Sequence, residues 1–394
     1  MRDSPPYRAP RHLIGALHRS LGTGSMKERV SETLRILRSV VGTLCRGVVA
    51  GPVQIASLWA SGAMRSPRII VFLVPGLEQI DGGILSIFNL YRFSIELSNE
   101  HHAKVLMCYY PGQWRGKWRY RSVDGAITIY PYALVTLLCR RAESMLVHIP
   151  NIAVPYFLEM GGRRLAQLRR KHGLRINILN QNILHMPADI AIHRLREAVP
   201  ELSCTTAHPS YTTAEYRRRW GVPVHHLPAF TYPHEPVVSS YETKRNLLIV
   251  SPDPSPHRDA VLGKISSELP HLQIQVISGM RFEEYLKLAQ VAKWSLTFGE
   301  GLDDYFIGVS LRGGVGFAVY NQDFFTPEFK DLPTVYPDWD SLADNIVGDI
   351  KAMDNEQAMA AYTAQVLPLL TQTWSSAKTR LALKEFYQGR FTLP

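Results

Sequence analysis

Short apolar segments alternate with amphipathic helical segments along most of this chain, stop at a proline-rich stretch, and then begin again. The first series opens with the apolar run Ile69–Val74, which is typical of a parallel strand buried on both faces. Four more strands are expected at Lys104–Tyr110, Met145–Ile149, Ile176–Asn180 and Ser203–Ala207. Helical spacing between them, clearest in Ile84–Leu97, Tyr156–His172 and Thr213–Trp220, predicts a doubly wound parallel sheet.

Four prolines, Pro223, Pro228, Pro233 and Pro236, interrupt this alternation and mark a linker. The pattern then restarts, with strands expected at 247–250, 273–277, 294–298 and 316–320 and helices at 259–269, 282–292 and 305–311. The predicted fold is therefore α/β, with two Rossmann-like doubly wound domains. Ligands in such sheets bind at the carboxyl ends of the strands, so a cleft between the domains is the expected site.

Domain boundaries follow from these shifts in pattern. We expect a helical N-terminal extension over 1–66, a first Rossmann-like domain over 67–236 and a second over 237–372. Residues 373–394 are expected to form a C-terminal helix that returns toward the first domain.

The net charge of +10 lies almost entirely in the N-terminal extension. Residues 1–68 hold eleven Lys and Arg against three acids, whereas the rest of the chain holds 33 against 31. A nucleic-acid-binding domain usually carries a basic face of its own, so this distribution argues against nucleic acid as a partner.

Within the extension, apolar residues recur at spacings of three and four, at Val30, Leu34, Leu37, Val41, Leu44 and Val48. The resulting basic amphipathic helix would either lie on an anionic membrane surface, through residues 25–64, or pack on the protein itself. Residues 47–64 are uncharged, but glycine and proline dilute them, so an interfacial or re-entrant segment is favoured over a membrane span. No secretory signal is predicted.

Several chemistries are excluded by motifs that the sequence lacks. The four cysteines lie far apart without a CxxC pair, which excludes a Cys-rich zinc site and a disulfide framework and fits a reducing compartment. HExxH, GxSxG, Walker A and kinase motifs are also absent, and the histidines show no metal-ligand spacing. We therefore expect no metal site.

The most informative segment is Ser295–Asn321, in which a predicted strand runs into Gly299-Glu300-Gly301 and a short helix follows near Asp304. A carboxylate between two glycines can accept hydrogen bonds from sugar hydroxyls that approach the backbone closely. The helix N-terminus suits a diphosphate. The alternative is that Glu300 is a loop acid that caps the following helix.

This segment resembles the C-terminal signature of retaining GT-B glycosyltransferases of the family-4-like group, and the resemblance extends over residues 68–387. It implies that Glu300 contacts the sugar of a nucleotide-diphosphate donor bound by the second domain, and that the first domain binds the acceptor. The family has a second Glu eight positions later, which holds the ribose, but this chain has Gly308 there. Asp303 or Asp304 is a candidate substitute.

The resemblance also implies roles for residues in other loops. Those assigned to the donor phosphates, sugar or base are Gly82, Gly83, His148, Arg258, Lys264, Arg281, Gly301, Asp303, Asp304 and Tyr305. The alternatives are ordinary turns, a structural histidine and solvated helix starts. The amides of Asn180–Asn182 would bind hydroxyls or close a turn. The segment Trp114–Arg121 would hold a sugar, a lipid diphosphate or single-stranded nucleic acid, or would form a surface loop.

The resulting hypothesis is a retaining glycosyltransferase that moves a sugar to a saccharide or lipid-linked acceptor in cell-envelope or exopolysaccharide biosynthesis. The family needs no catalytic metal or cofactor besides the donor. The protein would be cytoplasmic and peripheral on the inner face of the plasma membrane. Two alternatives remain: a non-catalytic GT-B-like membrane-associated assembly protein, which Gly308 motivates, and a nucleotide-sugar epimerase.

Overall fold

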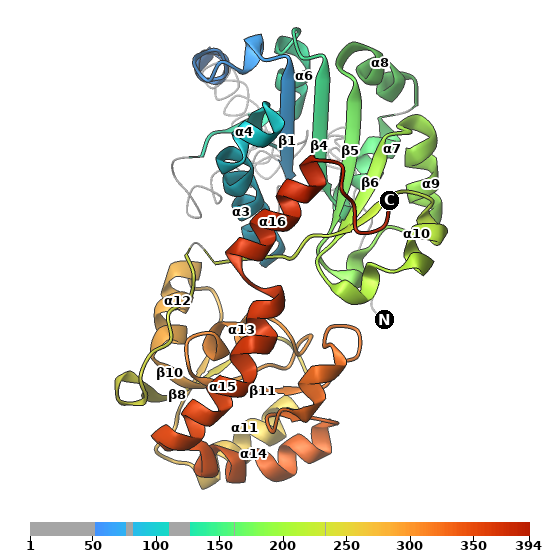
Figure 1. Ribbon diagram of the computed structural model, residues 1–394. Coiled ribbons are helices and arrows are strands. Elements are labelled where there is room, and N and C mark those ends of the chain that lie inside the picture. Colours follow the sequence, from blue (N-terminus) through green and yellow to red (C-terminus); the bar gives the residue numbers. More distant parts are fainter. Residues whose placement is uncertain (1–51, 76–81, 110–126, 161, 233) are drawn as a thin grey trace, which may run out of the picture.

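The computed structural model describes residues 52–75, 82–109, 127–160, 162–232 and 234–394, which form two α/β domains (Figure 1). The apolar stripe over 30–48 and the segment Trp114–Arg121 lie outside these described residues. No helix within them is both long enough and apolar enough to cross a bilayer.

The first domain contains a seven-stranded parallel sheet in the order β3-β2-β1-β4-β5-β6-β7. Its strands are β1 (Arg68–Val74), β2 (Lys104–Tyr109), β3 (Ile129–Pro131), β4 (Ser144–Pro150), β5 (Leu174–Asn180), β6 (Leu202–Thr206) and β7 (Val224–His226). All five strands predicted for this domain are present. The two that were not predicted, β3 and β7, have only three residues each, too few to show a pattern.

Helices cover both faces of this sheet (Figure 1). They are α3 (Gly82–Glu96), α4 (Ser98–His101), α6 (Tyr132–Leu138), α7 (Val154–Glu159), α8 (Gly162–His172), α9 (Asp189–Ala198) and α10 (Ala214–Trp220), together with a helix at 52–60. The helix predicted over Tyr156–His172 is two helices, because the sequence places two glycines, of low helix propensity, at 161 and 162.

The second domain contains a five-stranded parallel sheet in the order β12-β11-β10-β8-β9. The strands are β8 (Arg245–Val250), β9 (Gln273–Val276), β10 (Ala292–Leu296), β11 (Val315–Val319) and β12 (Val335–Tyr336). The helices of this half are α11 (Arg258–Glu268), α12 (Phe282–Val291), α13 (Asp304–Ser310), α14 (Trp339–Met353), α15 (Glu356–Thr373) and α16 (Ser376–Tyr387). The prediction of two doubly wound domains is confirmed.

The position of β1 in the first sheet explains why residues 69–74 are all apolar. Ile70 and Phe72 belong to a core cluster on one face of the sheet, and Ile69, Val71 and Leu73 belong to a second cluster on the other. A strand buried on both faces has no polar side to alternate with. The cluster of Phe72 continues into the second domain, so the domains share buried apolar surface.

Helix α16 returns to the first domain and packs on α3 and α4 (Figure 1). Arg380 Nε lies 2.7 Å from a carboxylate oxygen of Glu96, and Lys384 Nζ lies 2.7 Å from one of Glu100. The chain thus crosses between the domains twice, after Tyr232 and before α16. The crossings are joined, because the Ser376 amide donates to the Glu235 carboxylate over 2.8 Å.

The carboxyl ends of the two sheets face each other. Asn182, which follows β5, donates a hydrogen bond to Glu300, which follows β10. His208 follows β6, and its ring Nε2 bonds the carbonyl of Phe324, which follows β11. Loops that follow the carboxyl ends of the strands in the two sheets therefore meet, and we call this meeting point the junction.

Candidate functional site

The loop Gly299-Glu300-Gly301 is held in place by close packing that only glycine permits. Gly301 has φ of 90°, and a Cβ there would lie 2.5 Å from a ring carbon of Phe325. A Cβ on Gly299 would lie 2.7 Å from a carboxylate oxygen of Asp253. The two glycines therefore let the backbone around Glu300 pass between its neighbours.

The Glu300 side chain points toward the first domain and does not cap the following helix. Its carboxylate accepts a hydrogen bond from the Asn182 amide, and its side chain is half-buried. Burial raises the pKa of Glu300, the bond from Asn182 partly offsets this rise, and the nearby Asp253 carboxylate adds to it. Glu300 thus lies at the junction, in contact with both domains.

Asp303 performs the capping role that was the alternative for Glu300. One carboxylate oxygen accepts from the backbone amides of Tyr305 at 2.9 Å and Phe306 at 3.2 Å, at the start of α13. The other oxygen accepts from the Thr297 hydroxyl. Burial raises the pKa of Asp303 to about 7, against the effect of these hydrogen bonds. Because both oxygens are engaged, Asp303 supports the loop and does not reach a ligand.

Asp304 joins α13 to the first domain. One carboxylate oxygen accepts from the Thr231 hydroxyl at 2.9 Å and from the Tyr232 hydroxyl at 3.2 Å. A Cβ on Gly82 would lie 2.8 Å from its other oxygen. The first residue of α3, Gly82, therefore comes against the start of α13, and the neighbouring Gly83 is half-buried beside it.

Gly308, on the buried side of α13, leaves no room for a second glutamate. A Cβ there would collide with the Tyr285 hydroxyl and lie 3.3 Å from that of Tyr232. The Tyr285 hydroxyl also donates to the Asp304 carbonyl over 2.5 Å, which fixes it in this place. Two tyrosine hydroxyls thus occupy the volume of the missing carboxylate.

Arg258 is the predicted cation that lies nearest to the glutamate loop. Its guanidinium donates to the Asp253 carbonyl over 2.7 Å and lies 5.6 Å above the ring of Phe298, which precedes Gly299. A guanidinium has five N–H donors, so donors remain for an anion beside the loop.

Two other cations predicted for the donor lie elsewhere. The Lys264 ammonium donates to the carbonyls of Ala343 at 2.6 Å and Asp344 at 3.3 Å, which anchors α11 to α14. Arg281 follows β9 but pairs with Glu283 at the exposed start of α12. Both cations therefore have partners within the second domain and not at the Glu300 junction, and their assignment to the donor stays a prediction. Tyr305 is half-buried, with its ring packed edge-on against Tyr285.

His148 belongs to the core and does not line the junction. The side chain is fully buried, and its ring stacks on Phe72 with a centroid distance of 4.5 Å. The Asn177 amide lies 3.1 Å from Nδ1, and the Tyr387 hydroxyl of α16 lies 3.5 Å from Nε2. The prediction that His148 contacts the donor sugar is corrected accordingly, since no ligand reaches a fully buried ring.

Burial lowers the pKa of His148 to about 3, so the folded protein keeps this ring neutral. An unfolded histidine takes up a proton below pH ~6.5, and stability is lost as pH falls from there toward 3, by up to ~1.4 kcal/mol per pH unit. We expect the free energy of unfolding of His148→Phe to depend less steeply on pH in this window, measured by urea titration. The exposed His234→Phe should retain the wild-type slope, and equal slopes for all three proteins would contradict the interpretation.

Two residues at the junction, Asp253 and Tyr285, have roles that the sequence did not reveal. Asp253 follows β8, and its carboxylate borders Gly299; Ser-Pro-Asp after a strand is a weak signal for such a position. Tyr285 comes from the middle of α12, where an aromatic residue indicates only a core. Of the Asn180–Asn182 stretch, Asn182 reaches Glu300, whereas Asn180 is buried.

Although several carboxylates lie near the junction, no group of three or more described His, Cys, Asp or Glu residues is arranged to hold a metal ion.

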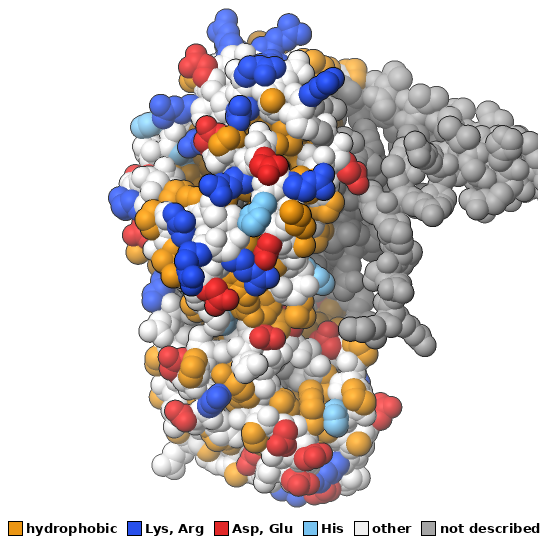
Figure 2. All heavy atoms as spheres, turned by 90° about the vertical axis from the view of Figure 1, so that its right-hand side faces the viewer, with side chains coloured by type: hydrophobic (Ala, Val, Ile, Leu, Met, Phe, Trp, Pro, Cys, Tyr) orange, Lys and Arg blue, Asp and Glu red, His pale blue; other side chains and the backbone are white. Residues whose placement is uncertain are grey.

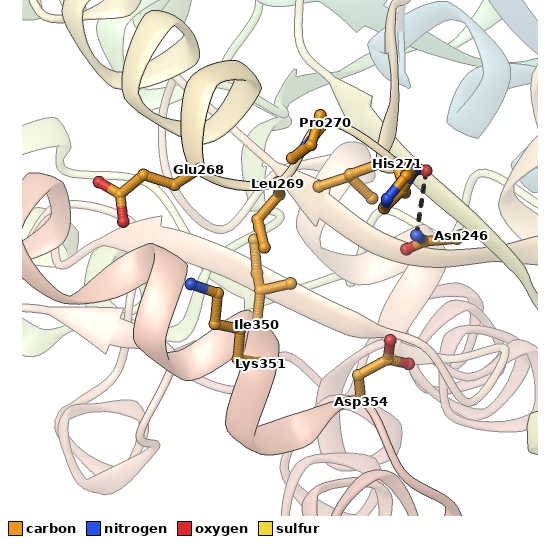
Figure 3. A pocket seen from close by; sticks show the side chains of 9 residues that line it. Asn246, Glu268, Leu269, Pro270, His271, Ile350, Lys351 and Asp354 are labelled. Carbon is orange, nitrogen blue, oxygen red and sulfur yellow. Dashed lines mark hydrogen bonds between the residues drawn. The ribbon is translucent and has the colours of Figure 1, made fainter.

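A separate pocket of about 210 Å³ lies at the amino ends of the strands of the second sheet, opposite the end that carries Glu300 (Figure 3). It is lined by Asn246 at the start of β8, by the α11–β9 turn, and by Ile350 and Lys351 near the end of α14. Because ligands in doubly wound sheets bind at the other ends of the strands, we assign the candidate site to the Glu300 junction.

Comparison with solved structures identifies the arrangement of the two domains. HepE from Anabaena, in complex with UDP-glucose, superposes with a TM-score of 0.52 and 11% identity, covering 82% of this chain and 99% of that one. TarM from S. aureus, with fondaparinux, α-GlcNAc-glycerol and UDP, gives a TM-score of 0.52 and 8% identity, covering 81% and 99%. The fold is GT-B. No protein-family model and no curated protein sequence matches this chain.

At this level of identity the comparison establishes the fold and not the reaction. The GT-B architecture agrees with the expectation from the sequence that two Rossmann-like domains meet at the carboxyl ends of their strands.

Proposed function

We propose that this protein is a glycosyltransferase that takes a sugar from a nucleotide-diphosphate donor bound at the Glu300 junction. The observation that carries the proposal is the position of the Glu300 carboxylate. It follows a central strand of the second sheet, between two glycines that permit close approach, and meets Asn182 from the first domain. The solved GT-B structures that hold UDP-glucose or UDP support a nucleotide-sugar ligand.

The chemistry of the neighbouring groups supports this choice of donor. A carboxylate and an amide on opposite sides of a junction can together accept from and donate to sugar hydroxyls. Arg258, beside the same loop, would neutralise the charge that develops on the diphosphate as the glycosidic bond breaks. Residues from both domains would then contribute to one site that excludes water on closure.

We further propose transfer with retention to a saccharide or lipid-linked acceptor of envelope or exported polysaccharides, on the basis of the resemblance around Glu300. The ribose would be held differently from the pattern of that family. The buried hydroxyls of Tyr285 and Tyr232 lie where the second glutamate would be, and both are already bonded to Asp304, so the ribose contact would come from other residues of the junction.

Gly308 also favours a second candidate, a GT-B protein without catalytic activity that assists assembly. The two candidates differ in what they bind. Binding of a nucleotide sugar in a thermal-shift screen supports the transferase, because a ligand that prefers the folded state raises the melting temperature. Absence of binding to every nucleotide sugar tested would favour the assembly protein.

With the donor identified, Arg258→Ala is expected to lower the rate of donor hydrolysis or transfer 10- to 100-fold, because one cationic contact to the leaving diphosphate is lost. Turnover of the purified variant is measured at saturating donor. Arg245→Ala, an exposed arginine at the far end of β8, serves as the matched control and should retain full turnover. A fully active Arg258→Ala would remove this residue from the site.

A further inference from the structure

The end of the first domain that points away from the second domain is strongly basic, although the net charge of the chain lies mostly in the extension. Figure 2 shows Lys and Arg side chains gathered at this end. Eight cations lie shortly before, or in the first two residues of, three neighbouring strands, β1, β4 and β5. They are Arg65, Arg68, Arg140, Arg141, Arg169, Arg170, Lys171 and Arg175. We call this set the basic edge.

The fold brings separate basic runs of the sequence together at the basic edge. The buried His172 ring lies between two backbone carbonyls, with Nδ1 2.9 Å from the oxygen of Ala142 and Nε2 3.2 Å from that of Thr136. Lys171 Nζ donates to the same Thr136 carbonyl over 3.1 Å. The end of α8 is therefore tied to the end of α6, and the run 169–171 lies beside the run 140–141.

Like charges at this edge are not neutralised within the part of the chain that the structure describes. None of its eight cations takes part in an ion pair between described residues. Two exposed glutamates, Glu143 and Glu201, directly precede β4 and β6. Burial and then the charge of Arg68 lower the pKa of Arg175, as expected for cations packed side by side, and the charge of Glu201 opposes part of this lowering.

An apolar helix face adjoins the basic edge. In the helix at 52–60, Gln54 and Leu58 are buried, whereas the outward residues are all apolar: Pro52, Val53, Ile55, Ala56, Trp59 and Ala60. Trp59 is 59% exposed and lies under the guanidinium of Arg65, 5.3 Å from the ring centroid. Leu137, 56% exposed at the end of α6, lies close to Arg140.

We propose that the basic edge and this apolar helix face together bind the surface of an anionic lipid bilayer. Unpaired arginines would attract anionic headgroups, and Trp59 and Leu137 would enter the boundary between headgroups and acyl chains. Cations beside exposed aliphatic side chains fit lipid better than nucleic acid, which binds cations through its phosphates and aromatic rings through its bases but offers nothing to aliphatic side chains. This surface is distinct from the Glu300 junction and does not depend on the proposed transfer.

The full-length protein is tested by flotation with phosphatidylcholine vesicles that contain about 30% phosphatidylglycerol, and with vesicles of phosphatidylcholine alone. The wild type is expected to bind the anionic vesicles selectively. Arg140→Glu/Arg141→Glu is expected to lower the partition coefficient about 30-fold or more, since each basic residue near an anionic surface contributes roughly fivefold. Trp59→Ser is expected to weaken binding about fivefold, at high salt as well as at low salt.

The control changes the same charge elsewhere: Lys287→Glu/Lys351→Glu, on exposed positions of two helices of the second domain, should bind as the wild type does. Wild-type binding by Arg140→Glu/Arg141→Glu would overturn the proposal. Equal binding to neutral vesicles, or binding to a single-stranded oligonucleotide without binding to vesicles, would also overturn it.

Discussion

Replacing Glu300 by Gln is expected to lower turnover of the nucleotide-sugar donor by about 10²- to 10³-fold, the loss typical of removing a charged contact that strengthens in the transition state. Gln keeps the size of the side chain and an oxygen that can accept from Asn182, so the loop should remain in place. The lost charge weakens the hydrogen bond from a sugar hydroxyl, because bonds to an ionised acceptor are about twice as strong as neutral ones. Turnover is measured with saturating donor and acceptor.

The matched control is Glu197→Gln, at an exposed position of α9 away from the junction. Both variants are expected to melt within about 1–2 °C of the wild type, because Glu197 is exposed and Gln at position 300 keeps the side-chain size and the bond from Asn182. Only Glu300→Gln should lose activity. A Glu300→Gln protein with unchanged kcat and KM would refute the assignment of the donor sugar to this carboxylate, whatever the donor proves to be.

Gly308→Glu, which restores the glutamate of the related enzymes, is expected to destabilise the protein and not to improve it. The new Cβ would collide with the Tyr285 hydroxyl, and the carboxylate would enter a buried space beside Asp304. Overpacking alone costs about 1–3 kcal/mol, and an unpaired buried charge adds to this. We expect a loss of at least about 3 kcal/mol in the free energy of unfolding, measured by urea titration of the two-domain chain.

Gly348→Glu is the matched control, because a Cβ on this exposed glycine of α14 would meet no neighbouring atom within 4 Å and the substitution gains helix propensity. It should be as stable as the wild type or slightly more stable. Tyr285→Ala combined with Gly308→Glu should recover part of the loss, since the collision is removed. If Gly308→Glu were as stable as Gly348→Glu, the steric explanation for the missing carboxylate would be wrong.

The fold could be predicted from the sequence because a parallel strand that is buried on both faces is a continuous apolar run. Such a run can be recognised without knowing which strands lie beside it. The run at β1 is apolar at successive positions because Phe72 and Val71 enter different cores. The sequence did not predict β3 and β7. Each has only three residues, which pair because the neighbouring strand has unpaired backbone groups. The predicted helices of the first series also did not include α9.

For the site, the sequence located the loop but not its partners. Gly299 and Gly301 flank Glu300 in the chain, so local spacing was enough to single out this carboxylate. Tyr285 reaches Gly308 from another helix, and no local pattern indicates a contact across 23 positions of sequence. His148 and Lys264 were assigned by analogy of position, and position along a strand or helix does not determine whether a side chain faces a ligand or the core.

The second passage of the chain between the domains has a mechanical consequence. Two domains that are joined by a single flexible segment can rotate and translate freely relative to each other. Here two segments connect the domains, and a hydrogen bond between Ser376 and Glu235 joins them. We expect such a paired joint to resist twisting of the domains more than their opening about one axis. A protease that cut only one of the two segments would leave the halves attached through the other. After a cut following Tyr232, the remaining segment leads into α16, which keeps its ion pairs to the first domain.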